Sequence, residues 1–265
     1  MDSSRSGPLG PALAPGEKVL FVDSKDRRRL VTLKEGGELH SHAGVTPHAS
    51  VLGQAEGITV RSSSGARYLV VRPTLADFVL AMPRGAQVIY PKDLGALLML
   101  VDVFPGARIL EAGVGSGALS LALVRAGANV VGYEIRPDFA ATAQNNVATF
   151  LPSTVDTYSV VERDVYLGIE EKGFDRIVLD LPEPWRVVKH AEAALRPGGI
   201  FVSYLPTIGQ VAQLREALGA SSFALASTIE VLHRSWHVEG QSVRPDHRMV
   251  AHTGFLTSAR LLQVK

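Results

Sequence analysis

The feature of this sequence that most constrains its fold is a regular alternation of short apolar runs with helix-like segments, which begins at about Ala81. The apolar runs have the length of strands, and the segments between them have the spacing of amphipathic helices. Such an alternation predicts an α/β domain in which helices cover a mostly parallel sheet. In sheets of this kind, ligands bind at the carboxyl ends of the strands, near the point where the strand order reverses. The expected strands are 108–111, 130–134, 158–161, 176–180 and 200–204, and the expected helices are 118–126, 139–150 and 187–195.

The first part of the chain has a different pattern. Residues 1–16 are rich in Gly, Pro and Ser, and we expect them to form a flexible N-terminus. Four β-like runs follow, with turn-forming clusters such as K-E-G-G and S-S-S-G between them and no segment of helix length. The sequence therefore predicts a small β domain over 17–73 and an α/β domain over 74–265. The four β-like runs are 18–22, 29–33, 58–61 and 67–71.

Composition and charge exclude several classes of function. The 265 residues include no cysteine, which excludes disulfides, thiol chemistry and thiolate metal sites. The formal net charge is only +1, so a nucleic acid would have to bind to a local basic patch rather than to a uniformly basic surface. The N-terminus lacks the apolar segment of a secretory signal, and the longest apolar stretch, around 94–104, is interrupted by Asp102. We therefore expect a cytoplasmic protein.

A glycine-rich segment follows the first strand of the predicted sheet. In E-A-G-V-G-S-G-A-L, Gly113, Gly115 and Gly117 allow a sharp turn and a close approach of the backbone to a ligand. Glu134 lies about twenty residues further on, at the end of the second strand, where an acid binds ribose hydroxyl groups. The string also fits the dinucleotide pattern G-x-G-x-x-G/A, with Ala118 in the last place. These features alone do not distinguish NAD from S-adenosylmethionine.

Three acids favour S-adenosylmethionine. Glu111 directly precedes the turn, where its carboxylate suits the ammonium group of a methionine and would repel a pyrophosphate. Asp164 ends the third strand, in a position suited to the amino group of an adenine. Asp180 ends the fourth strand in V-L-D-L-P-E-P-W, where a dehydrogenase needs no acid followed by prolines. The sequence therefore favours a methyltransferase, and an NAD-dependent oxidoreductase is the alternative.

A set of motifs carries a more specific resemblance. In chain order the sequence contains E-L-H-S-H-A-G, Q-V-I-Y-P-K-D, P-G-A-R-I-L-E-A-G-V-G-S-G, Y-E-I-R-P, L-D-L-P-E-P-W, Y-L-P-T-I-G-Q-V and R-M-V-A-H-T-G-F-L. From about Asp23 onward the chain resembles the bacterial and archaeal tRNA (adenine-N1)-methyltransferases, which modify the T-loop adenine at tRNA position 58. The glycine loop is common to many methyltransferases, whereas the combination of Y-P-K-D, D-L-x-x-P-W and H-T-G-F-L is far more specific. The resemblance implies a Rossmann-like class I methyltransferase fold with a small N-terminal β domain.

The resemblance also implies roles for individual residues. Asp180 aligns with the active-site aspartate of the family, and Tyr90 and Tyr204 align with tyrosines at the pocket of the target base. The ring nitrogen already carries a lone pair, so the main task is to align it with the methyl group. A carboxylate that accepts a hydrogen bond from the exocyclic amino group would stabilise the charge that methylation creates, and we expect this role for Asp180. The residues expected to bind the cofactor are Glu111, Gly113, Val114, Gly115, Ser116, Gly117, Leu119, Glu134, Asp164 and Asp180.

The partners follow from the same resemblance, which implies a tRNA substrate and a homotetramer. An adenine inside folded tRNA must be extruded before it reacts, and the two tyrosines would stack on it. Pro182, after Leu181, departs from some relatives and puts the local backbone in doubt. Three alternatives stay open: Asp180 as a helix N-cap, the tyrosines as core packing, and a non-catalytic tRNA-binding subunit. The last is disfavoured because the expected cofactor residues are all present.

Several basic and histidine residues invite other interpretations. His40, His42 and His48 suggest a metal site, but the chemistry above requires no metal, so we expect RNA contact or packing instead. The cluster K-D-R-R-R (25–29) is either a solvated surface or a phosphate contact. The same alternatives apply to Arg244 and Arg248. His247 and His252 could reach the base pocket, without a catalytic role.

Overall fold

The computed structural model describes residues 11–85 and 87–263. The chain forms two compact units, Met1–Met82 and Pro83–Lys265. The division lies after a short helix, α1 (Leu75–Ala81), which the sequence analysis assigned to the second domain. Residues 1–10 of the expected flexible N-terminus lie outside the described residues.

The first unit contains a four-stranded antiparallel sheet with the order β2-β1-β6-β5. Along β6, the alternate residues Tyr68 and Val70 are buried and Arg67 and Leu69 are exposed, as expected for a sheet with one face on a core. The four predicted strands are confirmed, but a hairpin was missed because its strands are short and mostly polar. The strands are β1 (Lys18–Asp23), β2 (Arg28–Thr32), β5 (Ile58–Arg61) and β6 (Arg67–Val71), with β3 (Glu38–Ser41) and β4 (Gly44–Pro47) in the hairpin.

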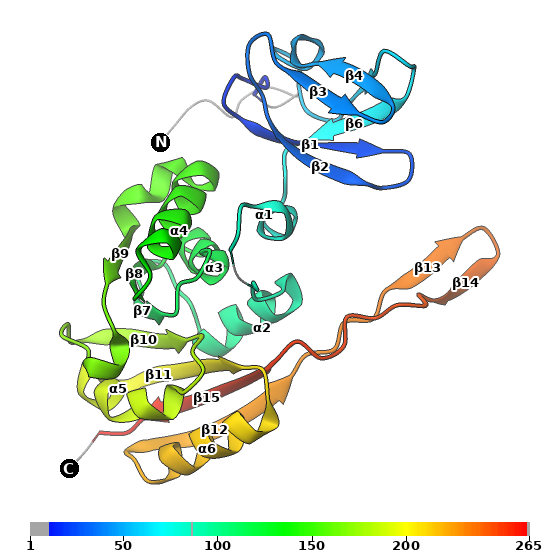
Figure 1. The fold of residues 1–265 in the computed structure, drawn as a ribbon. Helices are drawn as coiled ribbons and strands as arrows, with labels where there is room; N and C mark the ends of the chain where they lie inside the picture. Colours follow the sequence, from blue (N-terminus) through cyan, green and yellow to red (C-terminus); the bar gives the residue numbers. More distant parts are fainter. Residues whose placement is uncertain (1–10, 86, 264–265) are drawn as a thin grey trace. The chain divides into compact units, whose positions relative to one another are not determined.

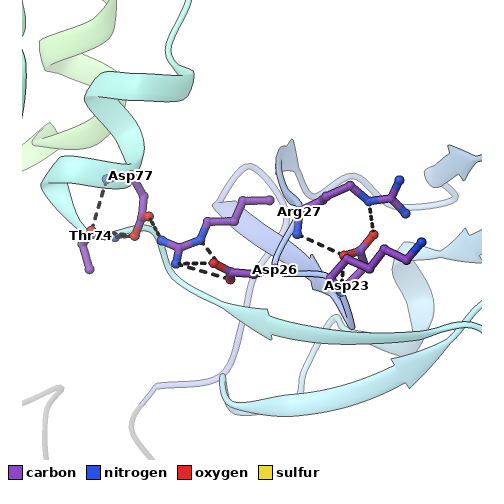
Figure 2. A network of polar contacts seen from close by, with 7 residues as sticks. Asp23, Asp26, Arg27, Thr74 and Asp77 are labelled. Atoms are coloured by element: carbon purple, nitrogen blue, oxygen red, sulfur yellow. Dashed lines mark hydrogen bonds and ion pairs between the residues drawn. The ribbon is translucent and has the colours of Figure 1, made fainter. Parts of the chain in front are cut away.

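Helix α1 is held to this unit by its first turn. Thr74 and Asp77 form a capping box, in which each side chain bonds to the backbone N–H of the other (Figure 2). Arg28 at the start of β2 donates to the Asp77 carboxylate, with 2.5 Å between Nη1 and Oδ1. These contacts explain why the division follows Met82 and not Pro73.

The second unit is built on a seven-stranded sheet with the order β12-β15-β11-β10-β7-β8-β9 (Figure 1). The five strands from β11 to β9 are parallel, and β15 is inserted antiparallel between β11 and β12. All five predicted strands are present in it, whereas β12 and β15 were not predicted. The bounds are β7 (Arg108–Ala112), β8 (Asn129–Glu134), β9 (Tyr158–Glu162), β10 (Phe174–Leu179), β11 (Leu195–Leu205), β12 (Phe223–Glu230) and β15 (Phe255–Leu261).

Helices cover both faces of this sheet. Successive strand residues point to opposite faces, so Leu110 and Glu111 of β7 face different helices. Leu110 belongs to a core with α5 and α6, whereas Glu111 bonds to Ser120 of α3. No helix within the described residues is long and apolar enough to cross a membrane. The helices are α2 (Pro91–Val101), α3 (Ala118–Arg125), α4 (Pro137–Phe150), α5 (Val188–Ala194) and α6 (Ile208–Gly219), and the 3₁₀ helices are η1 (His48–Ser50), η2 (Pro152–Thr157), η3 (Val165–Leu167) and η4 (Pro184–Val187).

A two-stranded arm extends from the far end of β12, made of β13 (Trp236–Glu239) and β14 (Ser242–Pro245) (Figure 1). Its strand pairing places Trp236 and Pro245 opposite each other, and Val238 opposite Val243. These four residues share one face of the arm, because side chains alternate along each strand. Trp236, Val238 and Val243 are 59%, 70% and 61% exposed. The arm therefore carries an apolar face that the chain itself does not cover.

Candidate active site

The glycine loop lies where the strand order of the sheet reverses. Strand β7 has β8 on one side and β10 on the other, so the loop after β7 meets the end of β10. Gly113 has a φ of +80°, and a Cβ there would collide with the carbonyl oxygen of Asp180. Gly117, with a φ of +84°, is the N-cap of α3. The local sequence thus produces a tight turn, and the sheet order brings Asp180 to it.

Glu111 is fully buried below this loop. The Ser120 hydroxyl donates to Oε2 over 2.6 Å, whereas Oε1 has no partner among the described residues. The pKa of Glu111 is raised to about 8, chiefly by burial and also by the charges of Asp180 and Glu134, while the hydrogen bonds from Ser120 oppose the shift. Glu111 lines a cavity together with the loop and Asp180, and the buried Ser116 hydroxyl in the same cavity is also without a partner. The two unpaired oxygens fit the ammonium end of a methionine.

A second cavity follows on the other side of Gly113. It is lined by Glu134 at the end of β8 and by Asp164 at the end of β9, together with Tyr166 and Leu181. Glu134 accepts from the backbone N–H of Gly115 through Oε2, so the loop and this acid hold each other. Asp164 caps η3 by accepting from the Tyr166 N–H. The cavity thus offers carboxylates and apolar walls of the kind that an adenosine requires.

Asp180 directly follows β10 and is only partly buried by the chain. Its backbone N–H donates to the carbonyl of Ala112, and Asp180 lines the Glu111 cavity. The pKa of Asp180 is raised to about 7, chiefly by desolvation and in part by the charge of Glu134. The helix N-cap interpretation is wrong, because Glu183 occupies the cap of η4 and Val187 that of α5. Pro184 is the first residue of η4, so this proline starts the 3₁₀ helix that follows the strand and does not contribute to a cap at Asp180.

Tyr90 and Tyr204 line a third cavity, of about 360 Å³. Tyr90 precedes α2, where Pro91 occupies the first helical position, and Tyr204 is the last residue but one of β11. The Tyr204 hydroxyl donates to the carbonyl of Thr253 over 2.7 Å, and burial raises its pKa to about 12. Gln87 lines both this cavity and the Glu111 cavity, which are therefore neighbours. Both tyrosines are partly exposed and line the same cavity, so packing in the hydrophobic core does not by itself account for their positions.

The comparisons with known proteins identify the family. The model of the tRNA methyltransferase complex GCD14 subunit matches residues 67–247, and the TrmI-like N-terminal model matches 10–60. A Thermus thermophilus tRNA (adenine(58)-N(1))-methyltransferase TrmI is 41% identical over 251 residues, covering 91% of this chain and 96% of that protein. This chain belongs to the TrmI family. It is a methyltransferase of the Rossmann-like class I fold, as the sequence predicted.

Other members of the family extend the comparison. A Methanocaldococcus jannaschii relative, 33% identical over 91% of this chain and 94% of its own length, is named for adenines 57 and 58. A TrmI structure from Aquifex aeolicus superposes with a TM-score of 0.85 at 29% identity, over 96% of this chain and 100% of that one. A Thermotoga maritima structure described as a SAM-dependent O-methyltransferase reaches a TM-score of 0.91 at 33% identity over 96% of both chains. Neither the oxidoreductase nor the non-catalytic subunit finds support among these relatives.

The histidines and basic residues singled out in the sequence do not form a common site, because each contacts a different partner. His40 lies beside Glu38, His42 beside Arg27, and the buried His48 accepts from the Lys34 N–H. Within 11–85 and 87–263 no group of three or more His, Asp or Glu could hold a metal ion. In the basic cluster, Arg27 pairs with Asp23 (Figure 2) and Arg28 with Asp26 and Asp77. Arg244, His247 and Arg248 are exposed on or next to the arm.

Of the two histidines expected to reach the base pocket, His252 lines the tyrosine cavity and His247 does not. Sequence reasoning assigned no role to three other residues of the site: Gln87 and Thr253, which line the same cavity, and Ser120, which orients Glu111. His252 bonds to the Glu230 carboxylate over 2.6 Å and to the Pro206 carbonyl over 2.8 Å, and the Glu230 bond raises its pKa. The motif H-T-G-F-L contains His252 and Thr253, and it was a signal for both because the sequence suggested no contact partner for it. Gln87 belongs to the motif Q-V-I-Y-P-K-D, which pointed to Tyr90 alone, and nothing local marked Ser120.

Proposed function

We propose that this protein transfers the methyl group of S-adenosylmethionine to N1 of the adenine at position 58 of tRNA. One observation carries the proposal. The cavity of Glu111 and Asp180 adjoins the cavity of Tyr90 and Tyr204, with Gln87 in the wall of both. A cofactor in the first and a flipped base in the second would bring donor and acceptor together beside Asp180. The names of the TrmI relatives supply the acceptor atom and the tRNA position.

The cofactor would be held by the residues around the glycine loop. Glu111 and Ser116 would receive the methionine end, since their unpaired buried oxygens need a donor. Glu134 would bind the ribose, and Asp164 the adenine. Bound there, S-adenosylmethionine supplies an electrophilic methyl group. The other expected residues of this site are Gly113, Val114, Gly115, Gly117, Leu119 and Asp180, all of which line one of the two cavities or form the turn.

Asp180 would act on the charge that develops on the base. N1 of adenine attacks through its own lone pair, so no base is needed to remove a proton from it first. The ring becomes cationic, and its exocyclic amino group becomes a stronger donor. An ionised Asp180 carboxylate that accepts from this group stabilises the transition state more than the ground state. Tyr90 and Tyr204 would hold the extruded ring by stacking.

We further propose that the protein is a homotetramer. The arm supports an assembly, because a two-stranded hairpin with an exposed apolar face is marginally stable alone in water. Trp236, Val238 and Val243 together form such a face. A second copy of the chain is the occupant proposed for it.

The proposed function is tested with an unmodified tRNA transcript, S-adenosylmethionine and the purified protein. We expect one methyl group per tRNA at N1 of A58, located by reverse-transcription stops and by mass spectrometry of nucleosides. A transcript with G at position 58 is the matched control, and its residual methylation at A57 reports a second target. Absence of methylation in a fully folded protein that binds S-adenosylhomocysteine would overturn the proposal. Binding of NAD in place of S-adenosylhomocysteine would instead support the alternative function, an NAD-dependent oxidoreductase.

A further inference from the structure

A buried cluster of polar side chains lies beside the tyrosine cavity and has no part in the chemistry proposed above. Its members are Lys92, Asp93 and Thr253, of which the first two belong to Y-P-K-D and the third to H-T-G-F-L. Lys92 Nζ lies 2.8 Å from Asp93 Oδ1, and the two side chains are 4% and 0% exposed. An ion pair this deeply buried is expensive to desolvate and adds little stability by itself. Its position therefore needs another explanation.

The hydrogen bonds of the cluster are complete. The Lys92 ammonium donates to Asp93, to the Thr253 hydroxyl over 2.6 Å and to the Val231 carbonyl over 2.6 Å. The Thr253 hydroxyl in turn donates to Asp93 Oδ2 over 2.6 Å. Every N–H of the ammonium thus has an acceptor, and three segments are tied at one point: the first turn of α2, the residue after β12 and the residues before β15.

The same segments carry the walls of the tyrosine cavity. Tyr90 is the N-cap of α2, two positions before Lys92. Tyr204 donates to the Thr253 carbonyl, and a Cβ on Gly254 would lie 2.5 Å from the Tyr204 ring, so the ring packs directly on this backbone. Any shift of Thr253 relative to α2 would change the separation of the two tyrosines.

We propose that Lys92, Asp93 and Thr253 are positioning residues that set the separation of Tyr90 and Tyr204, and thereby the alignment of the target base. The inference rests on the proposed function, because it assigns the tyrosine cavity to the base. The cluster acts on the base and not on the cofactor, since Lys92, Asp93 and Thr253 do not line the cavities around the glycine loop. Thr253→Val is the sharpest change, because it keeps the shape of the side chain and removes both hydrogen bonds.

We expect Thr253→Val to lower the single-turnover methylation rate by about 10- to 100-fold, the scale of a misplaced reactant. The dissociation constant of S-adenosylhomocysteine should stay within about twofold of wild type, as only the base is misplaced. Thr253→Ser keeps the hydroxyl and should restore most of the rate. The double variant Lys92→Met, Asp93→Leu removes both charges together, so that no unpaired charge is left buried, and should show the same loss as Thr253→Val.

Thr257→Val is the matched control. Thr257 is fully buried in β15 and bonds to the Thr228 hydroxyl over 2.9 Å, away from the tyrosine cavity. It should lower Tm about as much as Thr253→Val and leave the rate unchanged. A wild-type methylation rate in folded Thr253→Val would overturn this inference but not the proposed function. So would a loss of rate in Thr253→Ser as large as that in Thr253→Val. A wild-type protein that methylates no tRNA overturns the proposed function and the inference with it.

Discussion

The carbonyl oxygen of Asp180 lies so close to Gly113 that no side chain could stand at the glycine's position. The turn after β7 and the end of β10 are therefore pressed together at the point where the strand order reverses. The loop proposed for the cofactor and the carboxylate proposed for the base meet at one edge of the sheet. A substitution at Gly113 should therefore shift Asp180, and a substitution at Asp180 should shift the loop at Gly113.

Replacement of Gly113 by alanine tests this contact. The Cβ would meet the Asp180 carbonyl, and the φ of +80° is strained for any L-residue. We expect a loss of stability of about 2–4 kcal/mol in urea unfolding and at least tenfold weaker binding of S-adenosylhomocysteine. Gly106→Ala is the control, since its φ of +83° is nearly the same and a Cβ there meets nothing within 4 Å. Equal losses in the two variants would contradict the importance of the contact.

Asp180→Ala should lower the single-turnover rate by about 10²–10³, the scale of one electrostatic contact to a developing charge. Affinity for S-adenosylhomocysteine should be largely kept. Glu183→Gln, in the same turn but half-buried and paired with Arg186, is the control and should retain the rate. An Asp180→Ala rate equal to wild type would remove Asp180 from the mechanism.

The rate should also depend on pH through the same carboxylate. The pKa of Asp180 is raised to about 7, and the proposed role requires its ionised form. The single-turnover rate should therefore rise about tenfold for each pH unit below 7 and level off above it. The residual rate of Asp180→Ala should lack this dependence. A flat wild-type profile between pH 5.5 and 8 would show that the ionised form is not needed.

Glu111 should make the ligand-free protein less stable as the pH rises. Its folded-state pKa of about 8 lies above the ordinary value of 4.5, so the folded state binds the proton more tightly. The stabilisation that this proton brings is complete below pH 4.5 and is lost progressively up to about pH 8, at about 1.4 kcal/mol per pKa unit. We expect Glu111→Gln to raise Tm relative to wild type at pH 9 more than at pH 5, while weakening S-adenosylhomocysteine binding. Parallel Tm curves for the two proteins would refute this.

The arm offers two neighbouring residues on opposite faces. Val243 lies on the apolar face with Val238, whereas Ser242 pairs with Glu239 on the other face. Val243→Asp should lower the mass in solution, measured by sedimentation velocity, because it puts a charge into the proposed interface. Ser242→Asp should not. A monomeric wild type, or the same mass for both variants, would count against the tetramer.

Much of the site could be predicted from sequence because its parts are local. Glu111, the three glycines and Asp180 are each adjacent to a strand end, and strand ends can be recognised from apolar runs of a few residues. The order of such strands in an α/β sheet follows few rules, which places their ends together. The contact between Arg28 and Asp77, which holds α1 to the first unit, could not be predicted because it leaves no local pattern in the sequence.

By itself, the sequence determined the strand–helix alternation, the glycine turn and the acids at the strand tips, since each depends on residues close in the chain. Only the tertiary structure decided what those acids meet. Ser120 reaches Glu111 because α3 packs on that face of β7, and Lys92 reaches Thr253 across 161 positions of sequence. The antiparallel insertion of β15 makes the second contact possible. Hydrogen bonds between distant segments depend on how helices and strands pack, and periodicity along the chain carries no record of them.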